Sequence, residues 1–276
     1  MPIGDEPKVD CHCHILDPAR FPYTPANPYL PAGQEIATAA QMDQVFAAHG
    51  VRNALLVQPN SGYGADNRCM LSTIATSGGR FKGMAIVPND IALAELARLK
   101  SLGIAGVAFN PSFHGVAYYL GTEALLTKLA ELDMFLRIQV HEQQPLDILP
   151  LIGGSKVRLL IDHCGRPIPA AGLGQPAFQA LLKLGRTGRA SVKLSGYIKF
   201  SNEAHPFPDT RPYVRALVDA FTLDHCIWGS DWPFLRAPQR VDYGPLLSLA
   251  EELFPSATDR RKLLWNTPRR LFGFGK

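Results

Sequence analysis

The sequence predicts an α/β fold, a single (β/α)8 barrel, on three observations. Apolar runs of strand length alternate regularly with helical segments, which is typical of a parallel sheet with helical crossovers. Eight such units, with a repeat of roughly 30 residues, fill the 276-residue chain, as in a closed barrel. The first run is not followed by a glycine-rich dinucleotide fingerprint, which disfavours an open doubly wound sheet. Because no segment resembles a linker, we expect one domain over residues 1–276.

The elements follow from apolar runs and from the residues that interrupt them. The segment TAAQMDQVFAAH is an amphipathic helical pattern that Gly50 ends. Residues 17–33 are rich in proline, so we expect a long loop there, and long loops in compact domains are usually functional. The expected strands are residues 9–14, 53–58, 81–87, 104–110, 134–140, 156–162, 190–196 and 226–231. The expected helices are residues 38–49, 67–76, 91–103, 122–133, 146–153, 176–185, 211–221 and 243–254.

Composition excludes several classes of protein. Hydrophobic residues at 46% and charged residues at 19% are ordinary for a globular protein and exclude disordered and collagen-like chains. The net charge of +4 is modest and its basic residues are dispersed, so we expect no nucleic-acid partner. Neither a signal core nor a run of about 20 apolar residues is present, so we expect a cytoplasmic protein without a membrane partner. The five cysteines indicate a reduced compartment. The oligomeric state is left open.

The stretch VDCHCH places candidate catalytic or metal-binding residues in the first expected strand. Alternate side chains of a strand share a face, so Asp10, His12 and His14 point one way while Cys11 and Cys13 point the other. Inside a barrel, two convergent imidazoles would form a site for a metal, a water or a substrate oxygen. The alternative is a strand whose histidines only satisfy hydrogen bonds in a polar core.

Polar residues recur where the other expected strands end, which is where barrel enzymes carry their active residues. Those after the first strand are Asn60, Ser61, Asn110, His141, His163, Lys193, Ser195 and Asp231. Each has a structural alternative. His141 could be a surface residue of its loop, His163 a hydrogen-bonded core histidine, and Lys193 an ion-pair partner of Asp10 or Asp162. His114 could reach the mouth, whereas His49, His205 and His225 are interpreted as surface residues.

These residues carry a family resemblance. The pattern resembles that of the amidohydrolase superfamily, specifically amidohydrolase-related family 2. It consists of HxH in the first strand, a histidine at the end of the sixth and an aspartate at the end of the eighth. The flanking segments FPYTPANPYLP, VQPNSGYGADNR, IDHCGRP, KLSGYIKFS, WGSDWP and NTPRRLFGF resemble the 2-pyrone-4,6-dicarboxylate lactonase group, which also contains sugar lactonases and a sugar-lactone isomerase. The resemblance runs nearly end to end.

The resemblance implies hydrolysis of a small lactone by an activated water. Asp231 matches the aspartate that activates the water, and His12, His14 and His163 would polarise the carbonyl oxygen. Arg166 and Lys199 would pair with a substrate carboxylate. The remaining substrate-binding candidates are Tyr29, Asn60 and His141.

Departures from the group bear on the substrate and on a metal. Ala108 stands where the dicarboxylate lactonases carry arginine, and Phe234 where they carry asparagine, which favours a monocarboxylate or sugar-derived lactone. Members of this lactonase group resemble metal-independent enzymes, so the resemblance implies that the reaction requires no cofactor. His141, however, completes with His12, His14 and Asp231 a ligand set that permits Zn²⁺ and is used by decarboxylases of the superfamily. A zinc-dependent decarboxylase is thus the alternative, and a non-catalytic binding barrel is the third.

Overall fold

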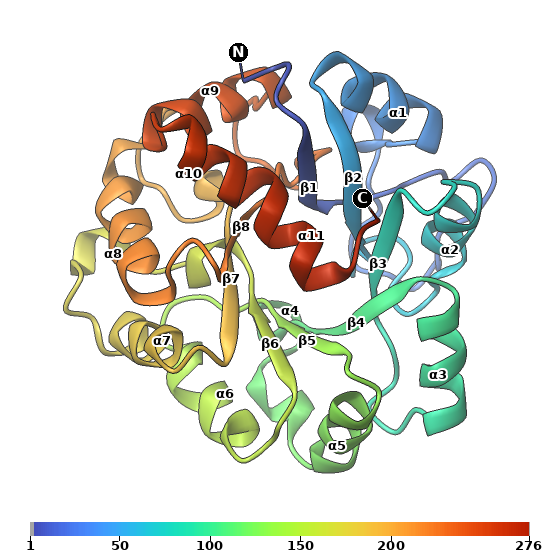
Figure 1. The fold of residues 1–276 in the computed structure, drawn as a ribbon. Coiled ribbons are helices and arrows are strands. Elements are labelled where there is room, and N and C mark those ends of the chain that lie inside the picture. Colours follow the sequence, from blue (N-terminus) through green and yellow to red (C-terminus); the bar gives the residue numbers. More distant parts are fainter. Residues whose placement is uncertain (1–2, 276) are drawn as a thin grey trace. The chain divides into compact units, whose positions relative to one another are not determined.

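The structure, a computed structural model, describes residues 3–275, and its elements are labelled in Figure 1. Within this range eight strands form a sheet in the order β1 to β8, which is the strand order of the predicted (β/α)8 barrel. The strands are β1 (Lys8–Cys13), β2 (Val51–Val57), β3 (Phe81–Ala85), β4 (Ile104–Phe109), β5 (Phe135–Ile138), β6 (Arg158–Ile161), β7 (Ala190–Leu194) and β8 (Cys226–Trp228).

The strands end earlier than the apolar pattern predicts, most clearly at β8. The expected strand ran to Asp231, but β8 ends at Trp228. Asp231 has a φ of 65°, a left-handed conformation that cannot continue a strand. Apart from Lys193, which lies within β7, the polar residues that were predicted at the ends of the later strands lie in the loops that follow those strands.

Eight expected helices are present. They are α1 (Ala39–Ala48), α2 (Arg68–Ala75), α3 (Leu93–Ser101), α5 (Glu123–Glu131), α6 (Gln144–Gly153), α7 (Pro176–Arg186), α8 (Arg211–Phe221) and α9 (Tyr243–Leu253). Thr38 caps α1 through a reciprocal bond with Gln41, which explains why this helix begins after the proline-rich loop.

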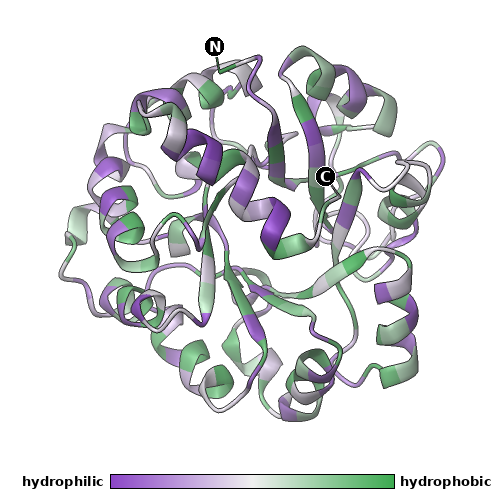
Figure 2. Cartoon of the chain, in the orientation of Figure 1, coloured by the Kyte–Doolittle hydropathy of each residue, from purple (hydrophilic) through white to green (hydrophobic). Residues whose placement is uncertain are grey.

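Among the described residues, three short α-helices were not predicted: α4 (Pro111–His114), α10 (Ala257–Arg261) and α11 (Thr267–Phe272). A π-helical turn joins α10 to α11, and Pro268 in the first turn of α11 obscured their common pattern. Hydrophilic and hydrophobic residues alternate along this segment (Figure 2). Among the described residues, no helix is both long enough and apolar enough to cross a membrane.

Contacts divide the chain into two compact units. The first comprises residues up to Ile86, the segment Leu102–Ile104 and residues from Ile227 onward. In it β1 pairs in parallel with β2, and β2 with β3. The second comprises Val87–Ser101 and Ala105–Cys226, where β4, β5, β6 and β7 pair in parallel in that order. The single domain over residues 1–276 stays a prediction, and residues 1, 2 and 276 lie outside the described range.

Each unit has an apolar core made by its strands and the helices that follow them. In the first unit Phe46 of α1 packs edge to face against Phe81 of β3. In the second, Phe178 of α7 packs in the same way against Tyr213 of α8. All five cysteines lie within the described residues, where all are buried and none forms a disulfide.

Candidate active site

His12, His14 and Asp231 come together in the first unit. Their ligand atoms lie within 4.8 Å of one another, and the three residues are at most 7% exposed. Oδ1 of Asp231 is 3.6 Å from Nε2 of His12 and 3.5 Å from Nε2 of His14. The two rings meet edge to face, with centroids 5.1 Å apart. The structure thus joins the first predicted strand to the loop after the last one, with a carboxylate between two imidazoles.

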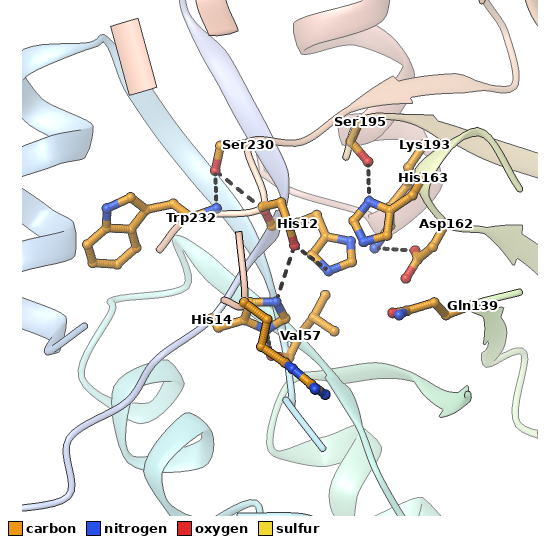
Figure 3. Close-up of polar contacts among 12 residues, drawn as sticks. His12, His14, Val57, Gln139, Asp162, His163, Lys193, Ser195, Ser230 and Trp232 are labelled. Carbon is orange, nitrogen blue, oxygen red and sulfur yellow. Dashed lines mark hydrogen bonds and ion pairs between the residues drawn. The ribbon is translucent and has the colours of Figure 1, made fainter. Parts of the chain in front are cut away.

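A carbonyl group sets the orientation of the His14 ring. Nδ1 of His14 is 2.7 Å from the carbonyl oxygen of Val57, where β2 ends (Figure 3). Because a carbonyl oxygen can only accept, the hydrogen of this bond is on Nδ1. Nε2 then faces Asp231 either with a lone pair or, in the imidazolium, with a second N–H. In the first state it can bind a cation, and in the second it can donate to an oxyanion.

Asp10 accepts four hydrogen bonds, and the two from Ser230 tie β1 to the loop after β8. Its Oδ1 accepts from the backbone N–H groups of His12 and Ser230, each at 3.0 Å. Its Oδ2 accepts from Oγ of Ser230 at 2.6 Å and from Oη of Tyr243 at 2.9 Å. Burial raises the pKa of this carboxyl, and the same hydrogen bonds act in the opposite direction. Asp10 therefore serves as a fully buried anchor for the segment that carries Asp231.

The backbone continues this connection on both sides of Asp231. The N–H of Asp231 donates to the carbonyl oxygen of His12 at 2.7 Å, and the N–H of His14 donates to that of Trp232 at 2.8 Å. Oγ of Ser230 accepts from the N–H of Trp232 at 3.0 Å (Figure 3). The three candidate side chains are thus held by main-chain bonds, so their spacing does not depend on flexible side chains alone.

Gly229 permits the close approach of the two segments. A Cβ at this position would lie 2.6 Å from Cβ of His12 and 2.7 Å from its backbone nitrogen. Real Cβ atoms do not come this close to backbone, so any side chain here would displace His12. Gly229 directly precedes Ser230 and Asp231. The order of the three residues therefore puts the close contact with His12 next to the residues that bind Asp10 and face the histidines.

In the second unit, Lys193 pairs with Asp162. Nζ of Lys193 is 3.1 Å from Oδ1 of Asp162, and Arg137 pairs with the other carboxylate oxygen. Of the two partners that the sequence offered for Lys193, the structure places Asp162 beside it (Figure 3). All three residues are buried, so the pairs are screened little by solvent.

His163 follows this cluster in a strained loop. Its Nδ1 is 3.0 Å from Oγ of Ser195, and the residue is 2% exposed (Figure 3). His163, Cys164 and Arg166 all have positive φ, between 46° and 58°. Such strain in non-glycine residues concentrates at functional sites. Its bond with Ser195 also fits the alternative of a satisfied core histidine, so its catalytic role stays a prediction.

The remaining candidates have individual surroundings. His141, which also belongs to the second unit, is about one-third exposed, with Nδ1 3.7 Å from Oε2 of Glu142. Lys199 lies half-buried in a short 3-10 turn after β7. The carbonyl oxygen of Asn60 accepts from Nδ2 of Asn27 at 2.6 Å, which holds the proline-rich loop.

Tyr29 is engaged by two residues that the sequence analysis missed. Its Oη donates to Oε2 of Glu35 at 2.5 Å, and the Cζ atom of Arg236 lies 4.8 Å from its ring centroid. Burial and the bond to Glu35 raise the pKa of Tyr29 to about 12. Ser230 and Tyr243, the partners of Asp10, were also missed. The sequence offered one hint of Ser230, which directly precedes Asp231. It offered none of Tyr243, because Tyr243 and Asp10 are far apart in the chain.

Comparison with known proteins places this site in a family. The model of the amidohydrolase family matches residues 9–274. The chain belongs to the amidohydrolase family. This confirms the resemblance stated from the HxH, DHCGRP and GSDWP segments.

Two curated amidohydrolase relatives are lactone hydrolases. The chain is 31% identical over 282 residues to the 4-sulfomuconolactone hydrolase of Hydrogenophaga intermedia, covering 99% of this chain and 90% of the relative. It is 28% identical over 285 residues to a 2-pyrone-4,6-dicarboxylate hydrolase of Comamonas testosteroni, covering 99% and 91%.

Solved structures confirm the barrel fold. A candidate 2-pyrone-4,6-dicarboxylic acid hydrolase of Pseudomonas putida matches with a TM-score of 0.84 and 29% identity over 98% of both chains. An amidohydrolase of Burkholderia multivorans with bound zinc matches at 0.75 and 21% identity, over 98% of this chain and 100% of the other. A 2,6-dihydroxybenzoate decarboxylase of Rhizobium is more distant, at 0.67 and 15% identity, over 97% and 99%. The last two share the fold alone.

The donors present in this amidohydrolase fit a divalent metal. His12, His14 and Asp231 supply two imidazoles and one carboxylate, a number that suits a catalytic zinc with an open position. The Nδ1–H of His14 is directed at a carbonyl, as in most histidines that bind metal through the other nitrogen. When bound, such an ion would polarise a carbonyl and acidify water. His141 as a further ligand stays a prediction.

Proposed function

We propose that this chain is a hydrolase that opens a small lactone by attack of a water on the ring carbonyl. The observation that carries the proposal is the Asp231 carboxylate, buried and held 3.5–3.6 Å from the imidazoles of both His12 and His14. A carboxylate in this position can take a proton from a water that attacks a carbonyl beside the two rings. The similarity to two lactone hydrolases over nearly the whole chain supports this chemistry.

The proposed reaction has two steps. First the water oxygen bonds to the carbonyl carbon while one water proton moves to Asp231, which leaves a tetrahedral oxyanion. The ring C–O bond then breaks, the carbonyl re-forms as a carboxylic acid, and the proton passes from Asp231 to the leaving ring oxygen. His12 and His14 would stabilise the oxyanion, and loss of one such donor typically costs about 3 kcal/mol of transition-state stabilisation. His163 is proposed as a third donor from the sequence resemblance.

The substrate we propose is small and anionic. Both relatives named above are hydrolases of lactones that carry acid groups, a sulfonate or carboxylates. The net charge of +4 is compatible with an anionic ligand. Arg166 and Lys199 are the cations that the resemblance assigns to a carboxylate. With Ala108 in place of an arginine, a monocarboxylate or a sugar-derived lactone is favoured over a dicarboxylate.

The second candidate function is a metal-dependent decarboxylation, which the fit of His12, His14 and Asp231 to a divalent metal favours. The two reactions differ in product: a lactonase forms one new acid per turnover and releases no CO₂. We propose the lactonase without an obligatory metal, as the resemblance to the metal-independent group implies.

A screen of carboxylated and sugar lactones, with and without added Zn²⁺, tests both proposals. After dialysis against a chelator, with residual metal quantified, we expect acid release to remain within about threefold of the untreated rate. Loss of acid release that Zn²⁺ restores would contradict the metal proposal. CO₂ release from an aromatic or unsaturated acid, with no lactone opened, would contradict the lactonase. Turnover of any substrate would exclude the hypothesis of a non-catalytic binding barrel.

A further inference from the structure

Arg236 presents its guanidinium on the loop that also carries Asp231. Two successive turns connect them: the N–H of Phe234 donates to the carbonyl oxygen of Asp231, and that of Ala237 to the carbonyl oxygen of Phe234. Each turn holds its end Cα atoms within about 7 Å, so the chain stays near Asp231 over these residues. Asp231, Phe234 and Arg236 all have positive φ, a conformation that costs energy in non-glycine residues. The loop is therefore folded back on itself under strain.

Tyr29 and Glu35 fix the direction in which Arg236 points. The backbone N–H of Arg236 donates to Oε1 of Glu35 at 2.6 Å, while Oε2 of Glu35 accepts from Oη of Tyr29. The Arg236 guanidinium lies over the Tyr29 ring, with Cζ 4.8 Å from its centroid. Glu35 thus binds the backbone of Arg236, and the ring supports the side chain.

Among the described residues, the Arg236 guanidinium has no acidic partner. Within residues 3–275, no carboxylate lies within 4.0 Å of the Arg236 guanidinium nitrogens, and the residue is exposed. Arg240, four positions along the same loop, is instead paired with Asp242 at 2.9 Å. A guanidinium stacked on an aromatic ring keeps its planar set of N–H donors for a carboxylate or sulfonate.

We propose that Arg236 binds the anionic group of the substrate and thereby determines specificity for acid-bearing lactones. The inference rests on the proposed lactonase and adds to it a recognition residue held by Tyr29 and Glu35. The anion would pair with the N–H edge of the guanidinium while its lactone carbonyl lies beside Asp231. Ala108 stands where the dicarboxylate lactonases carry an arginine. Arg236 would supply a cation from the loop after β8 instead, which explains how an acid-bearing lactone can still be bound.

The test compares one lactone carboxylate, taken from the screen, with its neutral methyl ester. For Arg236→Ala we expect kcat/KM to fall about 10- to 100-fold on the carboxylate, mostly through KM, and to stay within about threefold on the ester. Arg240→Ala, the matched control on the same loop, should leave both substrates within about twofold.

Three outcomes would overturn the inference: an equal loss on both substrates, no loss on either, or an equal loss from Arg240→Ala, which would indicate a diffuse charge effect. None of these outcomes bears on the lactonase proposal, which is tested separately by the activity of Asp231→Asn and by whether any lactone is opened. Arg236→Lys, which keeps the charge without the planar set of donors, should recover only part of the loss.

Discussion

Asp231→Asn is expected to lower kcat on an accepted lactone by about 10²- to 10⁴-fold, the usual contribution of a general base. The amide has nearly the same volume as the carboxylate but cannot take a proton from water. Asp231 is buried, and its backbone N–H bond to His12 is unaffected by the change, so the fold should be kept. Steady-state rates together with a thermal melt measure both effects.

A control on the same loop makes this result specific. Asp242→Asn removes an acid that is about half exposed and paired with Arg240, and we expect kcat within about twofold of wild type. An Asp231→Asn enzyme that retained more than about a tenth of the wild-type rate would remove Asp231 from the proposed role of base.

Gly229→Ala is expected to have the second-largest effect, because the added methyl would lie 2.6 Å from Cβ of His12 and 2.7 Å from its backbone nitrogen. Backbone cannot rotate away as a flexible side chain can, so the loop after β8 and the end of β1 must separate. Overpacking of this kind typically costs 1–3 kcal/mol of folding free energy. Separating His12 from Asp231 should also lower kcat by about 100-fold, since displacements near 1 Å have effects of this size. Chemical denaturation and steady-state kinetics measure the two losses.

Gly244→Ala is the matched substitution. Gly244 lies in α9, and a Cβ there would have its nearest neighbour at 3.6 Å, an ordinary contact. Since alanine is favoured over glycine within a helix, this variant should be as stable as wild type or more stable, with unchanged kcat. Equal stability and activity of the Gly229→Ala enzyme would show that the approach of β8 to β1 is not needed for the site.

Local patterns in the sequence were sufficient for much of the fold and for the centre of the site. The alternation in VDCHCH put His12 and His14 on one face, and Asp231 was placed at the end of the eighth strand by counting units. Asp162 could be named as one of two possible partners of Lys193, the other being Asp10, because a buried lysine needs an acid nearby. The short helices α10 and α11 were missed, since a π turn and Pro268 interrupt their period.

What the sequence could not supply are contacts between distant segments. Tyr243 and Ser230 bind Asp10 across more than 200 residues, and no periodicity links those positions. Arg236 and Glu35 meet for the same reason, through two irregular loops whose conformation depends on one another. The need for glycine at 229 is likewise visible only once His12 lies against it.

A single turnover in ¹⁸O-labelled water tests the central claim most directly. If Asp231 acts as a base for a water that attacks the lactone carbonyl, one ¹⁸O atom enters the newly formed carboxylate of the product in the first turnover. The enzyme itself, recovered and digested, should carry no label at Asp231. Label in the Asp231 carboxylate, with an unlabelled first product, would instead show direct attack by this residue and contradict the proposed mechanism.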